Sequence, residues 1–178
     1  MNKRKLLPKI ALIIVAVCLQ LNMTAQNMQS TVKAQAMEMA KAVLAKDVEK
    51  LVKYMHPKVV EAAGGKEKML IARDTMNKYM QQFGAEIKKV TIGNPGTIIS
   101  YKNELQTTLP QTTEVKVMAS LISAETTLIA ISEDKGIHWY FIDTSIYRSD
   151  KVKKLLPNLS PDLVIPPMKP PKMTPIEQ

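Results

Sequence analysis

The chain has 178 residues and a formal net charge of +9 at pH 7, from 25 Lys and Arg against 16 Asp and Glu. The basic residues are scattered and no cluster joins them to aromatic side chains, so we expect no nucleic-acid partner. A chain of this length suits one domain with one hydrophobic core.

Residues 1–25 have the layout of a secretory signal peptide. A positive start precedes the almost wholly apolar run Ile10–Leu21, and a small-residue cleavage site follows near Ala25. The run has about 12 residues, fewer than the ~20 of an ordinary transmembrane helix, so we expect no stable membrane insertion after cleavage. A retained N-terminal anchor is the alternative. Lipidation at Cys18 is less favoured, because Val17 is a poor residue before a lipidated cysteine.

Cleavage after Ala25 removes 25 of the 178 residues and leaves 153. It also removes four of the 25 basic residues and none of the 16 acidic ones, so the net charge falls from +9 to +5. The mature chain has no cysteine and therefore no disulfide and no thiolate metal site. An exported protein without disulfides is expected in a bacterial periplasm or outside the cell.

Two helical segments are predicted next. The first has apolar residues at spacings of three and four from Val32 to Met55, interrupted at Asp47, which is expected to cap a second short helix, DVEKLVKYM. Pro57 is expected to stop this run. After the flexible pair Gly64-Gly65, a further helix is predicted from Lys66 to Phe83. Its apolar side comprises Met69, Ala72, Met76, Tyr79, Met80 and Phe83.

The rest of the domain is rich in β-branched and aromatic residues, which favour strands. In TEVKVMASL, alternate residues from Val115 to Leu121 are expected to share one face. Short turns indicate an antiparallel sheet, and helices followed by strands indicate an α+β fold. Five strands are predicted: EIKKVTIG, TIISYKNELQT, TEVKVMASLIS, TTLIAIS and IHWYFID.

The stretch SEDKGIHW fits the pattern S-x-D-x-G-x-x-W and resembles the Asp-box of sialidases and other β-propellers. A propeller needs at least four blades of ~40–50 residues with repeated motifs, and this chain has one copy. We therefore interpret it as a tight turn rather than as a carbohydrate site. In this turn, Asp134 is expected to accept hydrogen bonds from backbone N–H groups, and Gly136 is expected to have a positive φ.

Residues 148–178 contain seven of the eleven prolines. They predict a short helical turn near Lys151–Leu156 and then an extended tail with polyproline II geometry. A spacer is the favoured interpretation of this tail, and a partner-docking segment is the alternative.

The domain at 28–147 resembles the NTF2-like (SnoaL-like) superfamily. The resemblance is carried by the long first helix, the segment KDVEKLVKYMHPKVVEAAGG with Asp47, Leu51 and His56-Pro57, the helix from Lys66, and the antiparallel strands that follow. It covers about two thirds of the chain. It implies a cone in which a curved sheet wraps around the helices and leaves a pocket at its open end.

The superfamily includes isomerases, dehydratases, polyketide cyclases and small-molecule binders, and its enzymes typically place an Asp–His or Asp–Tyr pair in the pocket. The strands offer no obvious equivalent pair, so catalytic residues are not assigned. The sequence also has no HExxH motif, no compact Asp/Glu/His cluster and no phosphate loop, so we expect neither a metal nor a cofactor.

The pocket candidates are Tyr54, His56, Arg73, Tyr101 and Trp139. The favoured interpretation of Arg73 is a residue at the edge of the core; the alternative is an inward guanidinium that binds a carboxylate or phosphate. His56 is a candidate general base, or simply a local helix terminator. The aromatic candidates would line the pocket or belong to the core.

Three functional hypotheses follow. The first is an exported protein that binds a small, partly apolar ligand in a cone-shaped pocket. The second is a small isomerase- or cyclase-type enzyme that uses His56 with an acid such as Glu61. The third is a cell-envelope interaction module that forms a homodimer through its sheet and docks partners by its tail.

Overall fold

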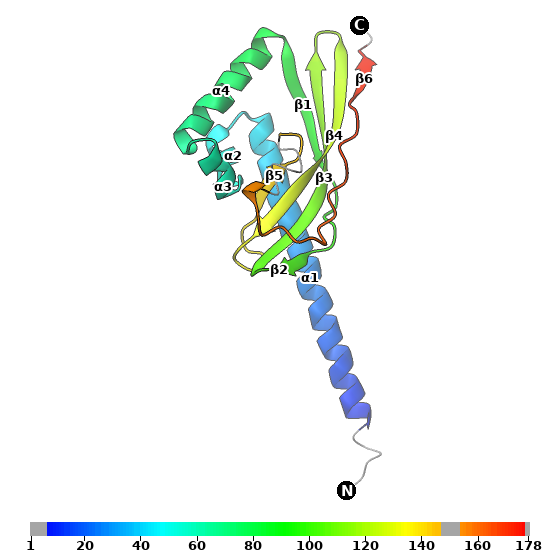
Figure 1. Ribbon diagram of the computed structural model, residues 1–178. Helices are drawn as coiled ribbons and strands as arrows, with labels where there is room; N and C mark the ends of the chain where they lie inside the picture. The colour runs from blue at the N-terminus through cyan, green and yellow to red at the C-terminus, as the bar shows by residue number, and fades with distance from the viewer. Residues whose placement is uncertain (1–6, 147–153, 177–178) are drawn as a thin grey trace.

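The computed structural model describes residues 7–146 and 154–176, with side chains from Gln26 onward. It has an α+β fold in which helices precede and flank a strongly curled antiparallel sheet (Figure 1). The sheet order is β1-β3-β4-β5, with β2 paired to β3 and β6 paired to β4. The elements are α1 (Leu7–Leu44), α2 (Val48–Lys53), α3 (Pro57–Ala62), α4 (Lys66–Gln82), β1 (Ala85–Ile92), β2 (Ile99–Tyr101), β3 (Glu104–Val117), β4 (Ser120–Ser132), β5 (Tyr140–Asp143) and β6 (Lys172–Pro175).

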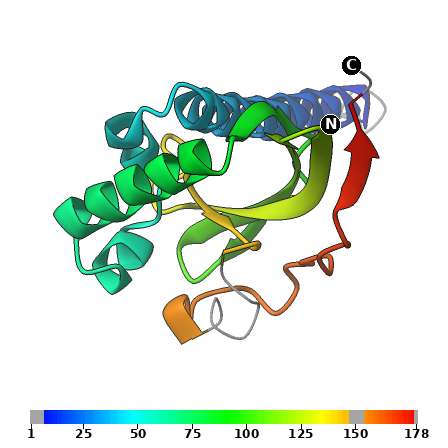
Figure 2. The same cartoon turned by 90° about the horizontal axis from the view of Figure 1, so that it is seen from above.

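Helix α1 runs along one side of the curled sheet (Figure 2). Its buried residues include Val32, Ala36 and Met39, which lie in the hydrophobic core with the sheet. The helical periodicity predicted from Val32 is thereby confirmed. The predicted cleavage site near Ala25 lies within α1, and the side chains of the predicted signal peptide, residues 1–25, lie outside the described part of the structure. Among the described residues, no helix has the length and apolar character needed to cross a membrane.

Capping residues determine where the two short helices after α1 begin. The Asp47 side chain accepts a 2.9 Å hydrogen bond from the backbone N–H of Lys50, so the predicted N-cap of α2 is confirmed. Pro57 follows the end of α2, as expected, but it also starts a helix that the sequence did not predict. It occupies the first turn of α3, where its fixed φ is suitable and no backbone N–H is required.

Two of the predicted strands are in fact hairpins. TIISYKNELQT turns at Lys102 and Asn103, whose φ angles are +47° and +66°, and TEVKVMASLIS turns at Met118, whose φ is +52°. The alternation predicted from Val115 to Leu121 therefore fails, because Ala119 lies in the turn. Both turns place non-glycine residues at positive φ, so the glycine that usually marks such hairpins is missing.

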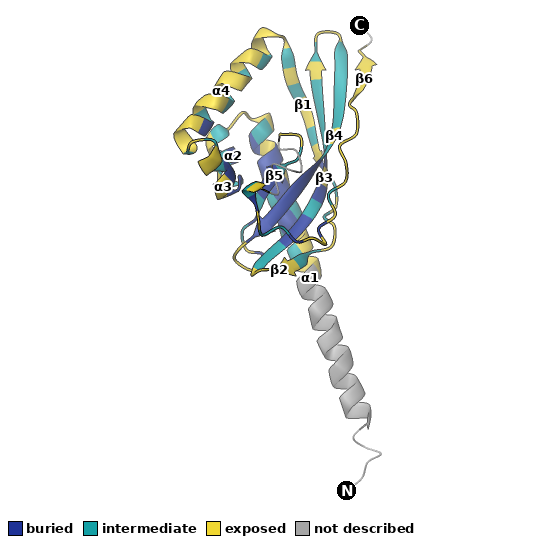
Figure 3. Cartoon of the chain, in the orientation of Figure 1, coloured by how far each residue is buried: buried dark blue, intermediate teal, exposed yellow. Residues whose placement is uncertain are grey.

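The sheet has an inner face toward α1 and an outer face beneath the C-terminal segment. Leu128 and Ala130 of β4 lie on the inner face, and Ile129 and Ile131 on the outer face. All four residues are at most 1% exposed, so both faces are covered in this half of β4 (Figure 3).

The C-terminal segment, residues 154–176, packs on the sheet. A spacer would not make such contacts. Leu156 and Leu163 belong to the core. Buried Gln106 of β3 donates to the carbonyl oxygen of Asn158 (2.8 Å) and accepts from the N–H of Ser160 (2.8 Å). The C-terminal segment therefore covers this part of the outer face of the sheet. In the predicted turn at Lys151–Leu156, residues 151–153 lie outside the described part, and residues 154–155 are helical.

Helix α4 has the predicted bounds to within one residue, but most of its apolar side is not buried. Met69 is buried, whereas Met76, Tyr79 and Phe83 are 56%, 56% and 67% exposed. The helix contacts α2, α3 and β1 along one narrow side, which leaves the apolar residues on its other side in solvent.

The predicted turn at SEDKGIHW is confirmed. One carboxylate oxygen of Asp134 accepts hydrogen bonds from the Ser132 hydroxyl (2.8 Å) and from the N–H groups of Ile137 (3.1 Å) and His138 (2.9 Å). Gly136 has φ +90°. These interactions lie within the turn itself, so they explain the motif without a ligand.

Candidate functional site

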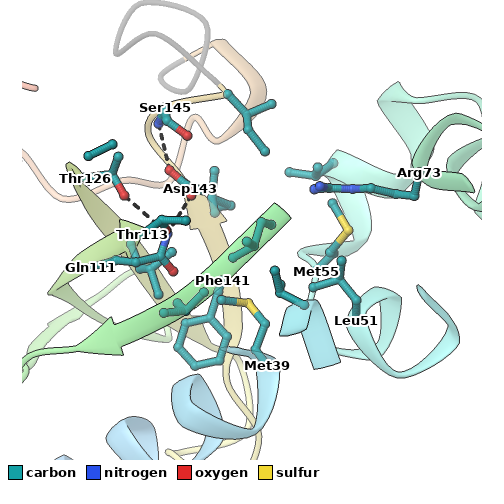
Figure 4. A pocket seen from close by; sticks show the side chains of 18 of the residues that line it. Met39, Leu51, Met55, Arg73, Gln111, Thr113, Thr126, Phe141, Asp143 and Ser145 are labelled. Atoms are coloured by element: carbon teal, nitrogen blue, oxygen red, sulfur yellow. Dashed lines mark hydrogen bonds between the residues drawn. The ribbon is translucent and has the colours of Figure 1, made fainter. Parts of the chain in front are cut away.

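A cavity of about 320 Å³ lies between the helices and the inner face of the sheet (Figure 4). Helices α1, α2, α3 and α4 contribute to one side of it, and strands β1, β3, β4 and β5 contribute to the other.

Most of the cavity wall is apolar. Met39 of α1 and Leu51 of α2 lie on the helical side, and Leu128 of β4 and Phe141 of β5 lie on the sheet side. All four are also buried members of the core. The methionine side chains at Met39 and Met55 are flexible and can adapt to the shape of a ligand.

Polar groups gather on the sheet side of the cavity. The Gln111 amide nitrogen Nε2 donates to Oδ2 of Asp143 (2.8 Å) and to Oγ1 of Thr126 (3.2 Å). The other Asp143 oxygen, Oδ1, accepts from the N–H of Ser145 (2.8 Å). These residues come from β3, β4 and β5 and from the turn after β5, and Figure 4 shows them converging. We call Gln111, Thr126 and Asp143 the polar cluster.

The amide of Gln111 is fixed in orientation by its partners. Nε2 must face the Asp143 carboxylate, because the flipped amide would place one acceptor oxygen against another. The carbonyl oxygen Oε1 accepts no hydrogen bond within the described residues, although Gln111 is only 7% exposed. Protein atoms do not seal it completely. Oε1 is therefore an acceptor held in place beside the cavity.

Arg73 is the one pocket candidate from the sequence that lines the cavity. It is half-buried on α4 and extends toward the cavity, across from the polar cluster (Figure 4). It lies one helical turn after buried Met69, on the side of α4 that faces the cavity.

His56 does not line the cavity. It is buried and caps α3, where Nδ1 accepts from the N–H of Lys58 (3.2 Å). Its other ring nitrogen lies 3.9 Å from Glu133. Burial, together with the positive charge of Lys58, lowers the pKa of His56 to about 4, so the imidazole is neutral at pH 7. The local interpretation of His56 fits this arrangement.

The three aromatic candidates also lie away from the cavity wall. The Tyr54 ring stacks on His138, with ring centroids 6.0 Å apart. Tyr101 ends β2, and the ammonium group of Lys102 lies 5.4 Å from the centre of its ring. Trp139 is fully buried in the core and donates from Nε1 to the carbonyl oxygen of Gly136 (3.1 Å). None of the three lines the cavity described above.

The sequence pattern does not indicate the polar cluster. Asp143 falls in a predicted strand, but nothing in its local pattern distinguishes it from a surface acid. Gln111 and Thr126 lie in a long hairpin whose predicted boundaries were wrong, so their shared register could not be seen. The correct pairing of Gln111 with Thr126 would have been needed to place them side by side.

The site contains no histidine, but it presents hydrogen-bond acceptors beside an apolar wall, which suits binding. Comparisons with protein-family models, with curated proteins and with solved structures found no match.

Proposed function

We propose that this chain is an exported small-molecule-binding protein of the NTF2-like class, with its ligand in the cavity between the helices and the inner face of the sheet. The cavity carries the proposal. Its volume of about 320 Å³ lies at the lower end of the ~300–1,000 Å³ range of ligand sites. An apolar wall with a few fixed polar groups is also the usual composition of such sites.

The class assignment is supported by the element order. A long helix, short helices and α4 precede a curled antiparallel sheet, and the cavity opens between them. Export is supported by the N-terminal sequence alone, with its basic start and its apolar run.

No observation favours the enzyme hypothesis over binding. Glu61, the acid proposed to act with His56, is exposed on α3 and lines a separate open groove with Tyr140. The pair therefore does not meet in the cavity. A general base must lie within hydrogen-bond reach of the proton that it removes.

The test is native mass spectrometry of the protein purified from its own cells, with gentle desolvation that preserves bound molecules. We expect a mass above that of the polypeptide, and denaturation should release the difference as a small molecule. An Ala124→Trp variant should lose this mass, because Ala124 lines the cavity and the indole would fill part of it.

The matched control is Ala72→Trp, which adds the same side chain on the exposed side of α4. It should keep the bound mass. Circular dichroism should show the same fold for both variants. If Ala124→Trp folds and keeps the same ligand with the same affinity, the ligand binds elsewhere and the proposal is wrong.

A further inference from the structure

We infer that the ligand is an apolar molecule with a hydrogen-bond-donating head, a hydroxyl or an amine, which binds at the polar cluster while its apolar body packs against the helical side of the cavity. This inference rests on the proposed function and names the class of ligand.

The side-chain oxygen of Gln111 is an accessible hydrogen-bond acceptor with a fixed position. Its amide is held by two hydrogen bonds from Nε2, to Asp143 and Thr126, so Oε1 cannot turn away without breaking both. No group among the described residues donates to this oxygen, which stays accessible beside the cavity. A donor from the ligand would supply the missing hydrogen bond at the place where the protein already holds its acceptor.

The Asp143 carboxylate has further positions at which it can accept hydrogen bonds. Its two carboxylate oxygens accept one hydrogen bond each, from Gln111 and from Ser145. A carboxylate has about four acceptor positions, so Asp143 can accept further donors. The polar cluster therefore offers two acceptors on one wall. A ligand carboxylate or phosphate placed there would face the Asp143 carboxylate and the Gln111 oxygen, with the Thr126 hydroxyl as the one donor of the polar cluster, whereas a hydroxyl or ammonium group would find two acceptors.

The helical side of the cavity determines what the rest of the ligand can be. Met39 and Leu51 lie on the helical side and present only apolar surface, so the part of the ligand beyond its head must be apolar. Arg73 lies on α4, on the far side of the cavity from the polar cluster (Figure 4). An anionic head would have to bind at the Arg73 side of the cavity. Probes that differ in the charge of their head can therefore distinguish the two positions.

The test uses four probes with one aromatic body: toluene, benzyl alcohol, benzylamine and benzoate. Each is titrated into the ligand-free mature protein, and its dissociation constant is measured from amide chemical shifts. We expect benzyl alcohol and benzylamine to bind about tenfold more tightly than toluene, which is the effect of one or two net hydrogen bonds. Benzoate should bind more weakly than benzyl alcohol.

Two variants locate the head. Gln111→Met keeps the length of the side chain and removes the acceptor, so it should remove most of the advantage of both donor probes over toluene. Asp143→Asn removes the charge, so it should weaken benzylamine about tenfold and benzyl alcohol by less than about threefold. Asp74→Asn is the matched control, because Asp74 is exposed on α4 in a pair with Lys78 and its loss should leave all four constants unchanged.

The outcomes separate the inference from the proposed function. Equal binding of toluene and the donor probes, lost in Ala124→Trp, would overturn the ligand class and keep the binding cavity. Benzoate as the tightest probe, weakened by Arg73→Gln, would also overturn the class, in favour of an anionic ligand. No binding by any probe, together with native spectra that show only the bare polypeptide, would overturn both.

Discussion

Gln111 of β3 and Asp143 of β5 are joined by a 2.8 Å hydrogen bond that passes over the intervening strand β4. Thr126 of β4 lies between them and accepts from the same amide nitrogen at 3.2 Å. Three strands are thus connected by side chains on the inner face of the sheet, where the neighbouring residues are apolar. This bridge holds the acceptors of the cavity in place.

Replacing Gln111 with leucine should lower the free energy of unfolding by about 1–3 kcal/mol, because Asp143 and Thr126 lose a shared donor in a half-buried environment. Urea denaturation of the ligand-free protein measures the change. Gln81→Leu, on the exposed surface of α4, makes the same chemical change and should alter stability by less than about 0.5 kcal/mol. Equal effects of the two substitutions would show that the bridge does not stabilise the fold.

Asp134→Ala should destabilise the protein by about 1–3 kcal/mol, because the Ser132 hydroxyl and two backbone N–H groups lose their common acceptor. These hydrogen bonds also hold the pKa of Asp134 below its usual value, with the His138 N–H as the largest cause. The stabilisation is therefore present above the ordinary pKa of an aspartate and is lost as the pH falls through the lower, folded value. Thermal melting at pH 7 compares this variant with Glu133→Ala, the exposed neighbour, which should be near neutral.

Local chemistry was readable from the sequence wherever a few adjacent residues decide it. The cap at Asp47, the turn at Asp134 and the bounds of α4 all follow from neighbours within about four positions. The hairpin turns at Lys102 and Met118 were missed because their residues are not those that usually adopt positive φ. The polar cluster was missed because it depends on register across three strands, which no local pattern encodes.

Burial was harder to predict than secondary structure. The helical spacing in α4 is genuine, yet Tyr79 and Phe83 face solvent, because periodicity indicates that a helix has an apolar side but not what covers that side. Conversely, the proline-rich composition of the tail favours an extended chain, and the segment is largely extended, but Leu156 and Leu163 are buried in the core. Composition says little about such docking.

His56 should make the stability of the protein depend on pH. Burial lowers its folded pKa to about 4 from 6.5, so between these values the unfolded chain binds a proton that the folded chain does not. Stability contributed by neutral His56 is therefore complete above pH 6.5 and is lost as the pH falls toward 4. The loss between pH 7 and pH 5 should be about 2 kcal/mol.

The measurement for His56 is the free energy of unfolding in urea at pH 7, 6 and 5. His56→Asn keeps a side chain that can cap α3 but does not titrate, so its stability should change by less than the wild type's over this range. The nearby charges are those of Lys58, Glu104 and Glu133. A variant with an unchanged pH dependence would assign the effect to other groups.

Alanine substitutions at two adjacent residues test whether the docking of the C-terminal segment stabilises the fold. Leu163 is 9% exposed within the core, whereas Val164 is 75% exposed. Leu163→Ala should cost about 2–4 kcal/mol, because it removes buried methyl groups and leaves a cavity against the outer face of the sheet. Val164→Ala should cost less than about 0.5 kcal/mol, since its side chain is in solvent and its carbonyl oxygen, which accepts from the Thr108 hydroxyl at 3.3 Å, is retained.

Hydrogen exchange distinguishes docking from a purely local effect. In the wild type, the N–H of Ser160 is bonded to Gln106 and should be protected, and Leu163→Ala should increase its exchange together with that of the β3 residues beneath the segment. Val164→Ala should change neither. If the two alanine variants are equally stable and Ser160 exchanges as fast as an exposed amide in the wild type, the segment is a free spacer. Its burial against Gln106 would then contribute nothing to the fold.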